Sequence, residues 1–314
     1  MKNGVLTEGL SSPSLPCRYM PSLVSIVIPT RNRAVLLGRL LDSFRSLCYP
    51  SWEAIVVDDG SVDRTPSVVQ RYRLERMPVR YYFQPWSNVG AARNRGIAEA
   101  RGELLAFIDD DCEASSNWLD SLAHAIENNP QALGVQGRTV TNREAATPFT
   151  RQIEQLSGGQ PYRTCNIAYR REVLIDLGGF DPLLIRGEDI ALSMRVLERG
   201  PIVFAPDAVV SHPPRPKEWA DRAAWRRLLA SEMHFRRVYP TYGPSRSQTL
   251  SIQKPEHVFS RWVLLPVRSY WRLHWRYFRK QPRDYLHHVP LIIREKLALL
   301  SLLPYILRNW RSDR

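Results

Sequence analysis

The chain has 314 residues, enough to bury a large core in one domain and to add an appendage. It carries 44 Lys and Arg against 31 Asp and Glu, a formal net charge of +13. Residues 1–212 hold 23 basic and 24 acidic residues, whereas residues 213–314 hold 21 and 7, together with six of the nine Trp. We therefore expect a near-neutral N-terminal domain and a basic, aromatic C-terminal segment with different partners.

Residues 1–21 lack the apolar run of a signal peptide, and we interpret them as a disordered leader. No stretch reaches the roughly 18 consecutive apolar residues of a membrane span, since the longest candidate, LALLSLLPYIL, is shorter. The cysteines are widely spaced without a CxxC pair, which predicts free thiols in a reducing compartment and a cytoplasmic protein. They are Cys17, Cys48, Cys112 and Cys165.

Predicted strands and helices alternate through the first part of the chain. Strands are expected at 24–30, 52–61, 79–84 and 103–111, and helices at 34–47, 65–77 and 90–102. This order implies βαβ crossovers and a mostly parallel sheet between helices, which binds ligands at the carboxyl ends of its strands. Beyond residue 135 the pattern is mixed, with a helix at 188–200 and a strand at 201–212, and the PPRP sequence at 213–216 predicts a linker.

Three consecutive carboxylates follow the apolar run LLAFI. In an extended chain Asp109 and Asp111 point to the same side and Asp110 to the other. Two hard oxygen ligands suit Mg²⁺ or Mn²⁺, and the phosphates of a substrate would complete the coordination shell. A solvated acidic turn is the alternative.

Two further turns carry polar groups at the same predicted edge of the sheet. Asp58 and Asp59 can accept hydrogen bonds from a nucleotide base or ribose, although turn and capping chemistry also explains such residues. Asn88 and Gly90 precede a helix whose N-terminus favours an anion, with Arg93 in its first turn. By itself, Arg93 also fits a surface or structural role.

Six segments resemble, in order and spacing, the family 2 glycosyltransferases. They are SIVIPTRNR, VVDDGSVDRT, NVGAARNRG, FIDDDC, CNIAYRREVLIDLGGFD and GEDIALSMR, within about residues 22–212. The resemblance implies an α/β GT-A fold: a Rossmann-like, mostly parallel central sheet with flanking helices at 22–212. Residues 213–314 would then be a basic, helical C-terminal extension.

The same resemblance implies roles for individual residues. Those expected to bind the nucleotide sugar are Pro29, Thr30, Arg31, Asp58, Asp59, Asn88, Gly90, Arg93, Asp109 and Asp110. Asp111, Asp109 and His212 are the expected metal ligands. Glu188 and Asp189 match the acidic pair whose aspartate is the general base, and Asn166 is the expected acceptor contact. Cys112 and Ala191 stand where many relatives carry another residue, which leaves the acceptor open.

Residues 267–280, VRSYWRLHWRYFRK, separate aromatic from basic side chains when they are plotted on a helix. Such a helix can lie in an anionic membrane interface, and we expect this contact within residues 258–307. Docking on the catalytic domain, an oligomer interface and nucleic-acid binding are alternatives, although no nucleic-acid recognition motif is visible.

Together these features predict an inverting glycosyltransferase that uses Mg²⁺ or Mn²⁺. It would move a sugar from a nucleoside-diphosphate sugar, UDP-linked by family frequency, to a carbohydrate or lipid-linked acceptor in bacterial polysaccharide, glycolipid or glycoconjugate synthesis. Such a displacement needs a cation on the leaving diphosphate and a base on the acceptor hydroxyl. A sugar-nucleotide pyrophosphorylase is one alternative, and a non-catalytic membrane scaffold is another. The enzyme would be peripheral on the inner face of the plasma membrane.

Overall fold

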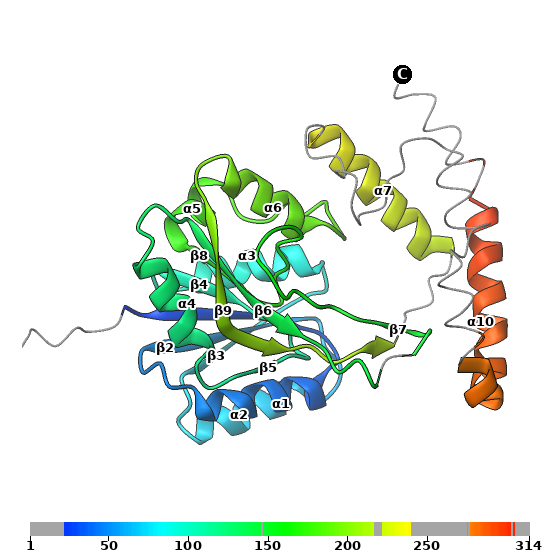
Figure 1. The fold of residues 1–314 in the computed structure, drawn as a ribbon, viewed down its shortest axis with the longest axis horizontal. Coiled ribbons are helices and arrows are strands. Elements are labelled where there is room, and N and C mark those ends of the chain that lie inside the picture. The colour runs from blue at the N-terminus through cyan, green and yellow to red at the C-terminus, as the bar shows by residue number, and fades with distance from the viewer. Residues whose placement is uncertain are drawn as a thin grey trace, which may run out of the picture.

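The computed structural model describes residues 22–145, 147–216, 222–239, 275, 277–302 and 304. Its main body is a three-layer α/β unit, and two long helices, α7 and α10, lie at one end of it (Figure 1). The expected leader, including Cys17, lies outside the described residues. So does most of the predicted amphipathic helix.

One eight-stranded sheet with the order β3-β2-β1-β4-β8-β6-β9-β5 forms the centre of the molecule. The strands β3, β2, β1 and β4 run parallel to one another, and β6 runs parallel to β9. Strand β8 is antiparallel to both β4 and β6, and β5 is antiparallel to β9. The strands are β1 Val24–Thr30, β2 Trp52–Asp59, β3 Val79–Gln84, β4 Leu104–Phe107, β5 Glu113–Ala114, β6 Gly134–Val140, β8 Ile167–Arg170 and β9 Ile202–Ser211.

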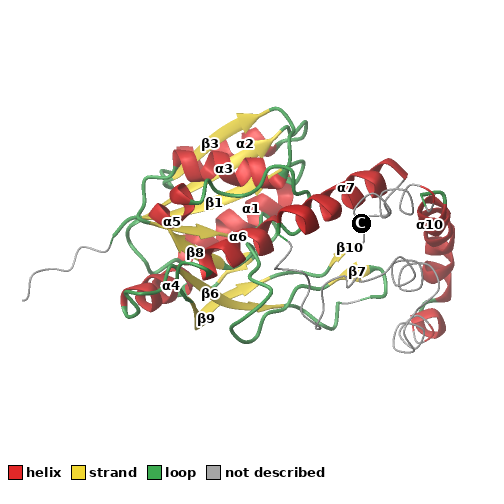
Figure 2. Cartoon of the chain, turned by 90° about the horizontal axis from the view of Figure 1, so that it is seen from above, coloured by secondary structure: helices red, strands yellow, loops and turns green. Residues whose placement is uncertain are grey.

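Helices cover both faces of this sheet (Figure 2). One core cluster joins alternate residues of β1 and β2 to α1, α2 and α4, and the other joins the remaining residues to α3, α5 and α6. The helices are α1 Ala34–Ser43, α2 Thr65–Leu74, α3 Val89–Glu99, α4 Trp118–Glu127, α5 Arg171–Asp176 and α6 Glu188–Leu197, and a 3₁₀ turn, η1, spans Phe44–Ser46. Because β1 and β2 are buried on both faces, their central residues, IVI at 26–28 and AIVV at 54–57, are apolar without interruption.

The predicted alternation of strands and helices is confirmed, and so is the mostly parallel α/β sheet. The first predicted helix is shorter than expected, because the chain tightens into η1 after Ser43. Strand β4 ends at Phe107, so Asp109, Asp110 and Asp111 lie in a turn beyond the strand. Cys112 N closes this turn on Asp109 O at 3.1 Å.

The PPRP stretch, which the sequence predicts to be a linker, is paired with another segment. Its last two residues form β10, Arg215–Pro216, which runs antiparallel to β7, Thr150–Arg151. A proline fits here because β10 is a short strand at the edge of a two-stranded ribbon. The predicted boundary therefore coincides with a segment that pairs with an earlier part of the chain.

Two helices follow the ribbon. α7, Arg222–Val238, docks on the loop before α6, where Ser231 Oγ accepts a 2.9 Å hydrogen bond from Ile185 N and His234 Nε2 lies 2.8 Å from Asp181 Oδ2. α10, Pro282–Leu300, packs against α7. Among the described residues, no helix is both long and apolar enough to cross a membrane.

Aromatic side chains connect the C-terminal region to the ribbon. Phe149, next to β7, stacks on the His288 ring with centroids 4.1 Å apart and also contacts Tyr285. Phe278 packs against Tyr285, whereas Trp275 remains 61% exposed. The described part of the predicted aromatic helix face is thus partly docked on the protein and partly open to solvent.

Candidate functional site

The three consecutive aspartates point in two directions, as the sequence predicts. Asp109 and Asp111 both contact the guanidinium of Arg215: its Nη2 lies 3.1 Å from Asp109 Oδ2 and donates to Asp111 Oδ1. Asp110 points away, toward β1. Asp109 and Asp111 therefore present oxygen atoms to one shared cationic position.

Asp110 is a buried anchor for the turn. Thr30 Oγ1 donates to its Oδ2 at 2.8 Å, and Arg33 Nη1 donates to its Oδ1 at 3.0 Å. Burial raises the pKa of Asp110 to about 6, although Arg33 favours the charged form. Thr30 and Asp110, both predicted to bind the nucleotide sugar, instead bond to each other and link the ends of β1 and β4.

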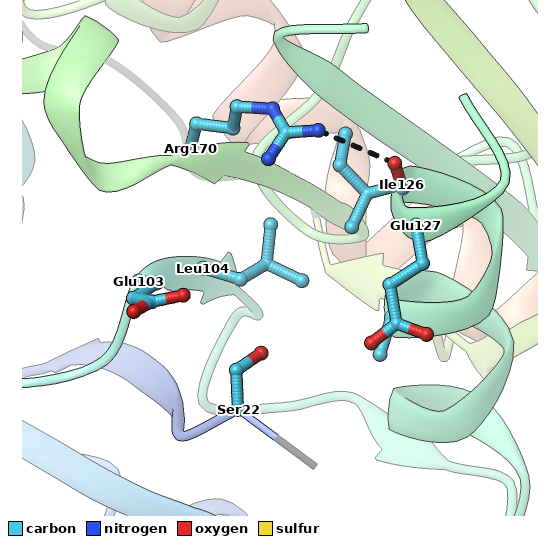
Figure 3. A pocket seen from close by; sticks show the side chains of 7 residues that line it. Ser22, Glu103, Leu104, Ile126, Glu127 and Arg170 are labelled. Carbon is cyan, nitrogen blue, oxygen red and sulfur yellow. Dashed lines mark hydrogen bonds between the residues drawn. The ribbon is translucent and has the colours of Figure 1, made fainter. Parts of the chain in front are cut away.

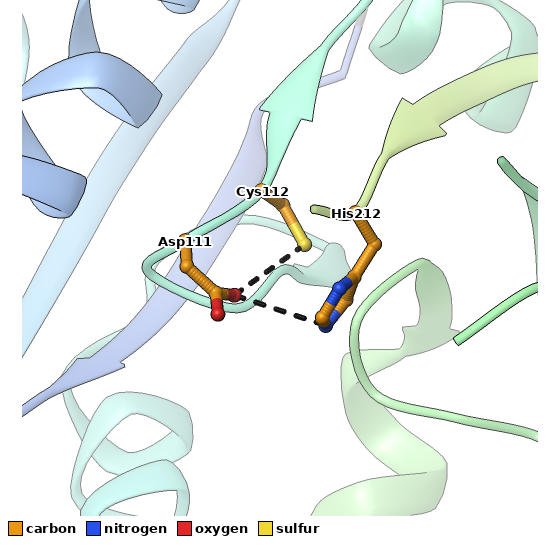
Figure 4. Close-up of side chains that lie close together, drawn as sticks. All are labelled: Asp111, Cys112 and His212. Carbon is orange, nitrogen blue, oxygen red and sulfur yellow. Dashed lines mark hydrogen bonds and ion pairs between the residues drawn. The ribbon is translucent and has the colours of Figure 1, made fainter. Parts of the chain in front are cut away.

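Asp111, Cys112 and His212 bring a carboxylate, a thiol and an imidazole together (Figure 4). One ligand atom of each lies within 4.8 Å of the others, and all three residues are buried. Burial raises the pKa of Cys112 well above its usual value, so its sulfur is a poor source of thiolate. Asp111 and His212 are consequently the better pair of metal ligands.

The orientation of His212 supports a ligand role. Its Nδ1 lies 2.9 Å from Pro213 O, so Nδ1 carries the proton and donates it to this carbonyl. The other nitrogen, Nε2, is buried without a hydrogen-bond partner and lies 3.8 Å from Asp111 Oδ1. A lone pair held beside a carboxylate oxygen fits a divalent cation, which removes the cost of the unpaired buried atom.

Arg93 joins the aspartate turn to the start of α6. It is almost fully buried, and its Nη1 donates to Glu188 Oε1 at 2.7 Å while its Nη2 donates to Asp109 Oδ1 at 3.1 Å. Burial opposes ionisation of Asp109, but Arg215 and Arg93 outweigh it and hold the pKa of this carboxyl below its ordinary value. A surface role for Arg93 is thus excluded by its burial.

Glu188 and Asp189 open α6, after Gly187 at φ +79°, a left-handed conformation that glycine adopts without strain. Burial raises the pKa of both carboxyls, and the Asp189 charge raises that of Glu188 further. The charge of Asp109 raises the pKa of Asp189, whereas Arg93 lowers it. The acidic pair and the aspartate turn therefore share one electrostatic environment.

Asp58 and Asp59, at the end of β2, differ in how many of their carboxylate oxygens are already hydrogen-bonded within the protein. Asp58 is fully buried and accepts from Ser61 N at 2.8 Å and Tyr81 Oη at 2.7 Å, which makes it part of the turn. Asp59 uses Oδ1 to accept from Gln84 Nε2 at 2.8 Å and Ser87 N at 3.0 Å. Within the described part of the chain no hydrogen bond reaches its Oδ2, so Asp59 suits ligand contact better.

An exposed aromatic ring lies at the rim near Asp59. The Arg31 guanidinium lies 5.0 Å from the Trp86 ring centroid, and Trp86 is 57% exposed. Pro29 precedes this group at the end of β1. The pair provides a flat cationic and aromatic surface on which a planar group can stack.

Asn88 and Gly90, both expected to bind the nucleotide sugar, have roles within the fold. Asn88 caps α3, because its Oδ1 accepts from Ala91 N at 2.8 Å while its Nδ2 donates to Pro182 O at 2.6 Å. A Cβ at Gly90 would lie 3.3 Å from Asn88 Oδ1, so a side chain there would press on the capping residue.

Asn166, the expected acceptor contact, is fully buried behind the site. Its Oδ1 accepts from Trp118 Nε1 at 2.9 Å, and its Nδ2 donates to Arg138 O and Ala208 O. The expectation for Asn166 is therefore corrected: the side chain ties three strands together, β6, β8 and β9, and has no surface to offer an acceptor.

Arg215 and Arg33 are site residues that the sequence did not identify. Arg33 contacts Asp110 directly and lies 3.9 Å from Asp111 Oδ2. Arg33 lies within the matched SIVIPTRNR segment, so its position was a usable signal. Arg215 follows a pair of prolines interpreted as a linker, and only the pairing of β10 with β7 brings it to the aspartates.

A pocket of about 270 Å³ lies elsewhere, between Ser22, Glu103, Ile126 and Arg170 (Figure 3). Ser22 and Glu103 precede β1 and β4, so this pocket is at the amino ends of the strands and away from the carboxylates. Arg170 donates there to main-chain carbonyls such as Ala132 O at 2.8 Å. The pocket has no contact with the candidate site.

Comparison with known families and proteins gives a consistent result. Residues 25–180 match the model of the family described as glycosyl transferase family 2. Glycosyltransferase AglE of Haloferax volcanii is 29% identical over 205 residues, 62% of this chain and 67% of that protein. Pre-mycofactocin glycosyltransferase of Mycobacterium tuberculosis is 33% identical over 221 residues, 64% of this chain but 45% of the relative. The chain thus spans about half the length of the second relative.

Solved structures share the fold at low sequence identity. S. aureus TarS with UDP-GlcNAc superimposes with a TM-score of 0.56 at 18% identity, covering 87% of this chain and 79% of that one. The mannosyltransferase PcManGT of Pyrobaculum calidifontis, with GDP-Man and Mn²⁺, gives 0.54 at 19% identity, covering 91% and 88%.

Proposed function

We propose that this chain, whose residues 25–180 match the model of glycosyl transferase family 2, transfers a sugar from a nucleoside-diphosphate sugar to an acceptor hydroxyl with inversion at the anomeric carbon. The α/β fold is that of the GT-A glycosyltransferases. One observation carries the proposal: buried Arg93 bonds both Asp109 and Glu188. This bridge supports the proposal, because the carboxylates proposed for the leaving diphosphate then lie beside those proposed for proton removal.

The donor binds, in this proposal, across the carboxyl ends of β1, β2 and β4. Asp59 Oδ2 accepts from the base or ribose, and Arg31 with Trp86 stacks beside it. Asp109 faces the ribose or the cation, while Asp110 and Asp58 support the turns. UDP is the expected nucleotide, with GDP the other candidate.

Asp189 is the proposed general base. It lies at the positive end of α6, and the raised pKa of its half-buried carboxyl makes it a stronger base than an exposed aspartate. Glu188, tied to Arg93, holds the pair in place. Removal of the acceptor proton by Asp189 and departure of the diphosphate on the opposite side give inversion without a covalent enzyme intermediate.

Asp111 and His212, with Asp109 beside them, are the proposed ligands of Mg²⁺ or Mn²⁺. The orphaned Nε2 of His212 and the oxygen atoms of Asp111 fit such a cation. When bound, the cation neutralises charge on the leaving diphosphate. A carbohydrate or lipid-linked acceptor and contact with an anionic membrane through residues 258–307 complete the proposal.

The alternatives gain nothing from these observations. None of the four relatives and structures described above is a pyrophosphorylase. A non-catalytic scaffold role explains neither the raised pKa of Asp189 nor the buried Nε2 of His212, which has no hydrogen-bond partner among the described residues.

Substitution Asp189→Asn tests the proposal. It should lower kcat for sugar transfer by at least about 100-fold, because the amide cannot accept the acceptor proton. Donor affinity, measured by calorimetry, should change little. Asp207→Asn, at an exposed position on β9, is the matched control. Transfer by Asp189→Asn at the rate of the control would disprove the assignment.

A further inference from the structure

Arg215 lies between the two carboxylates of the candidate cation site. Its Nη2 contacts Asp109 Oδ2 at 3.1 Å and Asp111 Oδ1, and its Nε pairs with Asp111 Oδ2. The side chain of Asp111 is only 2% exposed. One guanidinium therefore pairs with both aspartates and engages both oxygen atoms of Asp111.

The fold supplies this guanidinium and the candidate ligand His212 from one short segment. His212 follows β9, its Nδ1 is fixed by Pro213 O, and Arg215 begins β10 opposite Arg151 of β7. Two prolines between them restrict the backbone. The ribbon thus fixes the position of the Arg215 guanidinium relative to His212, the candidate metal ligand.

Arg215 and a bound divalent cation make competing demands on Asp111. Asp111 Oδ1 is the oxygen nearest to His212 Nε2, at 3.8 Å, and it is also the oxygen that accepts from Arg215 Nη2. A cation held by His212 and Asp111 needs this oxygen, and it repels a guanidinium at the same place. Arg215 and a bound cation therefore cannot both hold Asp111 Oδ1 at the same time.

One alternative is that Arg215 permanently takes the place of a metal ion. This alternative does not explain the unpaired nitrogen of His212. Its Nε2 remains buried and without a hydrogen-bond partner although Arg215 lies next to Asp111. An arginine that served as the only cation would leave this polar atom unsatisfied in every state of the enzyme.

We propose that Arg215 is the resident counter-ion of the cation site and moves to the nucleotide diphosphate when the cation binds. This inference rests on the proposed function. The planar guanidinium matches carboxylate and phosphate oxygens equally well. Its side chain is 28% exposed, so it is not locked into the interior, and the diphosphate would arrive beside the cation that displaces it.

The device couples two binding events. Arg215 weakens binding of the cation alone, because its release from the aspartates costs free energy. It strengthens binding of cation and nucleotide together, because the released guanidinium gains phosphate contacts. Asp109 and Asp111 thus keep a counter-ion before the cation binds, and the cation is held firmly only with a nucleotide.

Mn²⁺ binding, followed by the EPR signal of the free ion, tests this coupling on the full chain with and without UDP or GDP. Arg215→Gln should bind Mn²⁺ alone about tenfold more tightly than wild type, and Mn²⁺ with nucleotide about tenfold more weakly. Arg143→Gln, which removes an exposed arginine paired with Glu154, should behave as wild type.

Arg215→Lys separates charge from shape and retains a counter-ion if the Gln variant folds poorly. In the absence of nucleotide, this variant should bind Mn²⁺ as weakly as wild type. Nucleotide should increase its Mn²⁺ affinity less than in wild type, since an ammonium cannot form the two parallel hydrogen bonds that a guanidinium makes with a phosphate. Equal or weaker binding of Mn²⁺ alone by Arg215→Gln, in a folded protein, overturns the inference and leaves the glycosyltransferase proposal standing. Absence of Mn²⁺ binding in wild type and variants alike overturns both the inference and the metal requirement.

Discussion

Arg93 and Glu188 are 95 residues apart in the sequence, yet Arg93 Nη1 donates to Glu188 Oε1 at 2.7 Å in the interior of the protein. The other arm of the same guanidinium reaches Asp109. This residue holds the donor side and the base side of the proposed site together. It also stabilises the charged forms of carboxyls that burial would otherwise keep protonated.

Substitution Arg93→Gln should therefore damage catalysis more than it damages the fold. We expect kcat/KM to fall by at least about 100-fold, since both carboxylates lose their shared donor. Arg95→Gln, on the exposed side of the same helix and paired with Glu99, provides the control. Steady-state kinetics with circular dichroism of both variants decides the matter: full activity in Arg93→Gln would show that the bridge has no role.

The pH dependence should reveal the raised pKa of the acidic pair. A base must be deprotonated to act, so activity is lost as pH falls through the pKa of the pair, which lies above the ordinary carboxyl values of 3.8 and 4.5. Glu188→Gln removes the neighbouring negative charge and should move the acid limb of kcat/KM to lower pH. The exposed neighbour Glu198→Gln should leave the limb in place. An acid limb at the ordinary aspartate value in wild type would contradict the raised pKa.

Stability should depend on Glu53, which lies at the start of β2 far from the carboxylates. Burial opposes its ionisation, but Arg101 N, Arg80 Nη1 and Ser25 Oγ all donate to it and hold its pKa below the usual value. A depressed pKa stabilises the fold above the unfolded value, and this stabilisation is lost as pH falls through the folded pKa.

Glu53→Gln should consequently lower the free energy of unfolding by about 2 kcal/mol at pH 7, because charge-assisted hydrogen bonds are lost. The difference from wild type should shrink below pH 4.5, the ordinary value for this carboxyl. Urea unfolding at several pH values measures it, with the exposed Glu113→Gln as the reference. A difference that stays constant with pH would refute the linkage.

Much of the fold could be predicted because local sequence patterns, such as apolar runs and the turns after them, identify its strands and helices. The apolar runs of β1 and β2 identify buried parallel strands, and the turns after them locate Asp59 and Asp109 at one edge. Asp111 and His212 were assigned from the resemblance, and the structure brings them to 3.8 Å. Their role in metal binding remains a prediction.

The roles that the sequence did not predict depend mainly on contacts between segments far apart in the chain. Asn166 has a polar side chain in a matched segment, but its partners Trp118 and Ala208 come from elements that meet only in the folded sheet. Asn88 was interpreted through the charge of a helix end, whereas its capping bond to Ala91 N uses that end for stability. Arg215 follows two prolines, and its site role depends on a ribbon formed with residues more than 60 positions earlier.

The central claim is that Asp111 holds a divalent cation for a nucleoside diphosphate. The measurement that tests it most directly is the thermal shift of wild type and Asp111→Asn with UDP and with GDP, each with and without Mn²⁺. We predict a shift with one nucleotide that requires Mn²⁺ and disappears in Asp111→Asn, while Asp120→Asn on the exposed side of α4 keeps it. A nucleotide shift of the same size without Mn²⁺, or one that survives in Asp111→Asn, would contradict the claim.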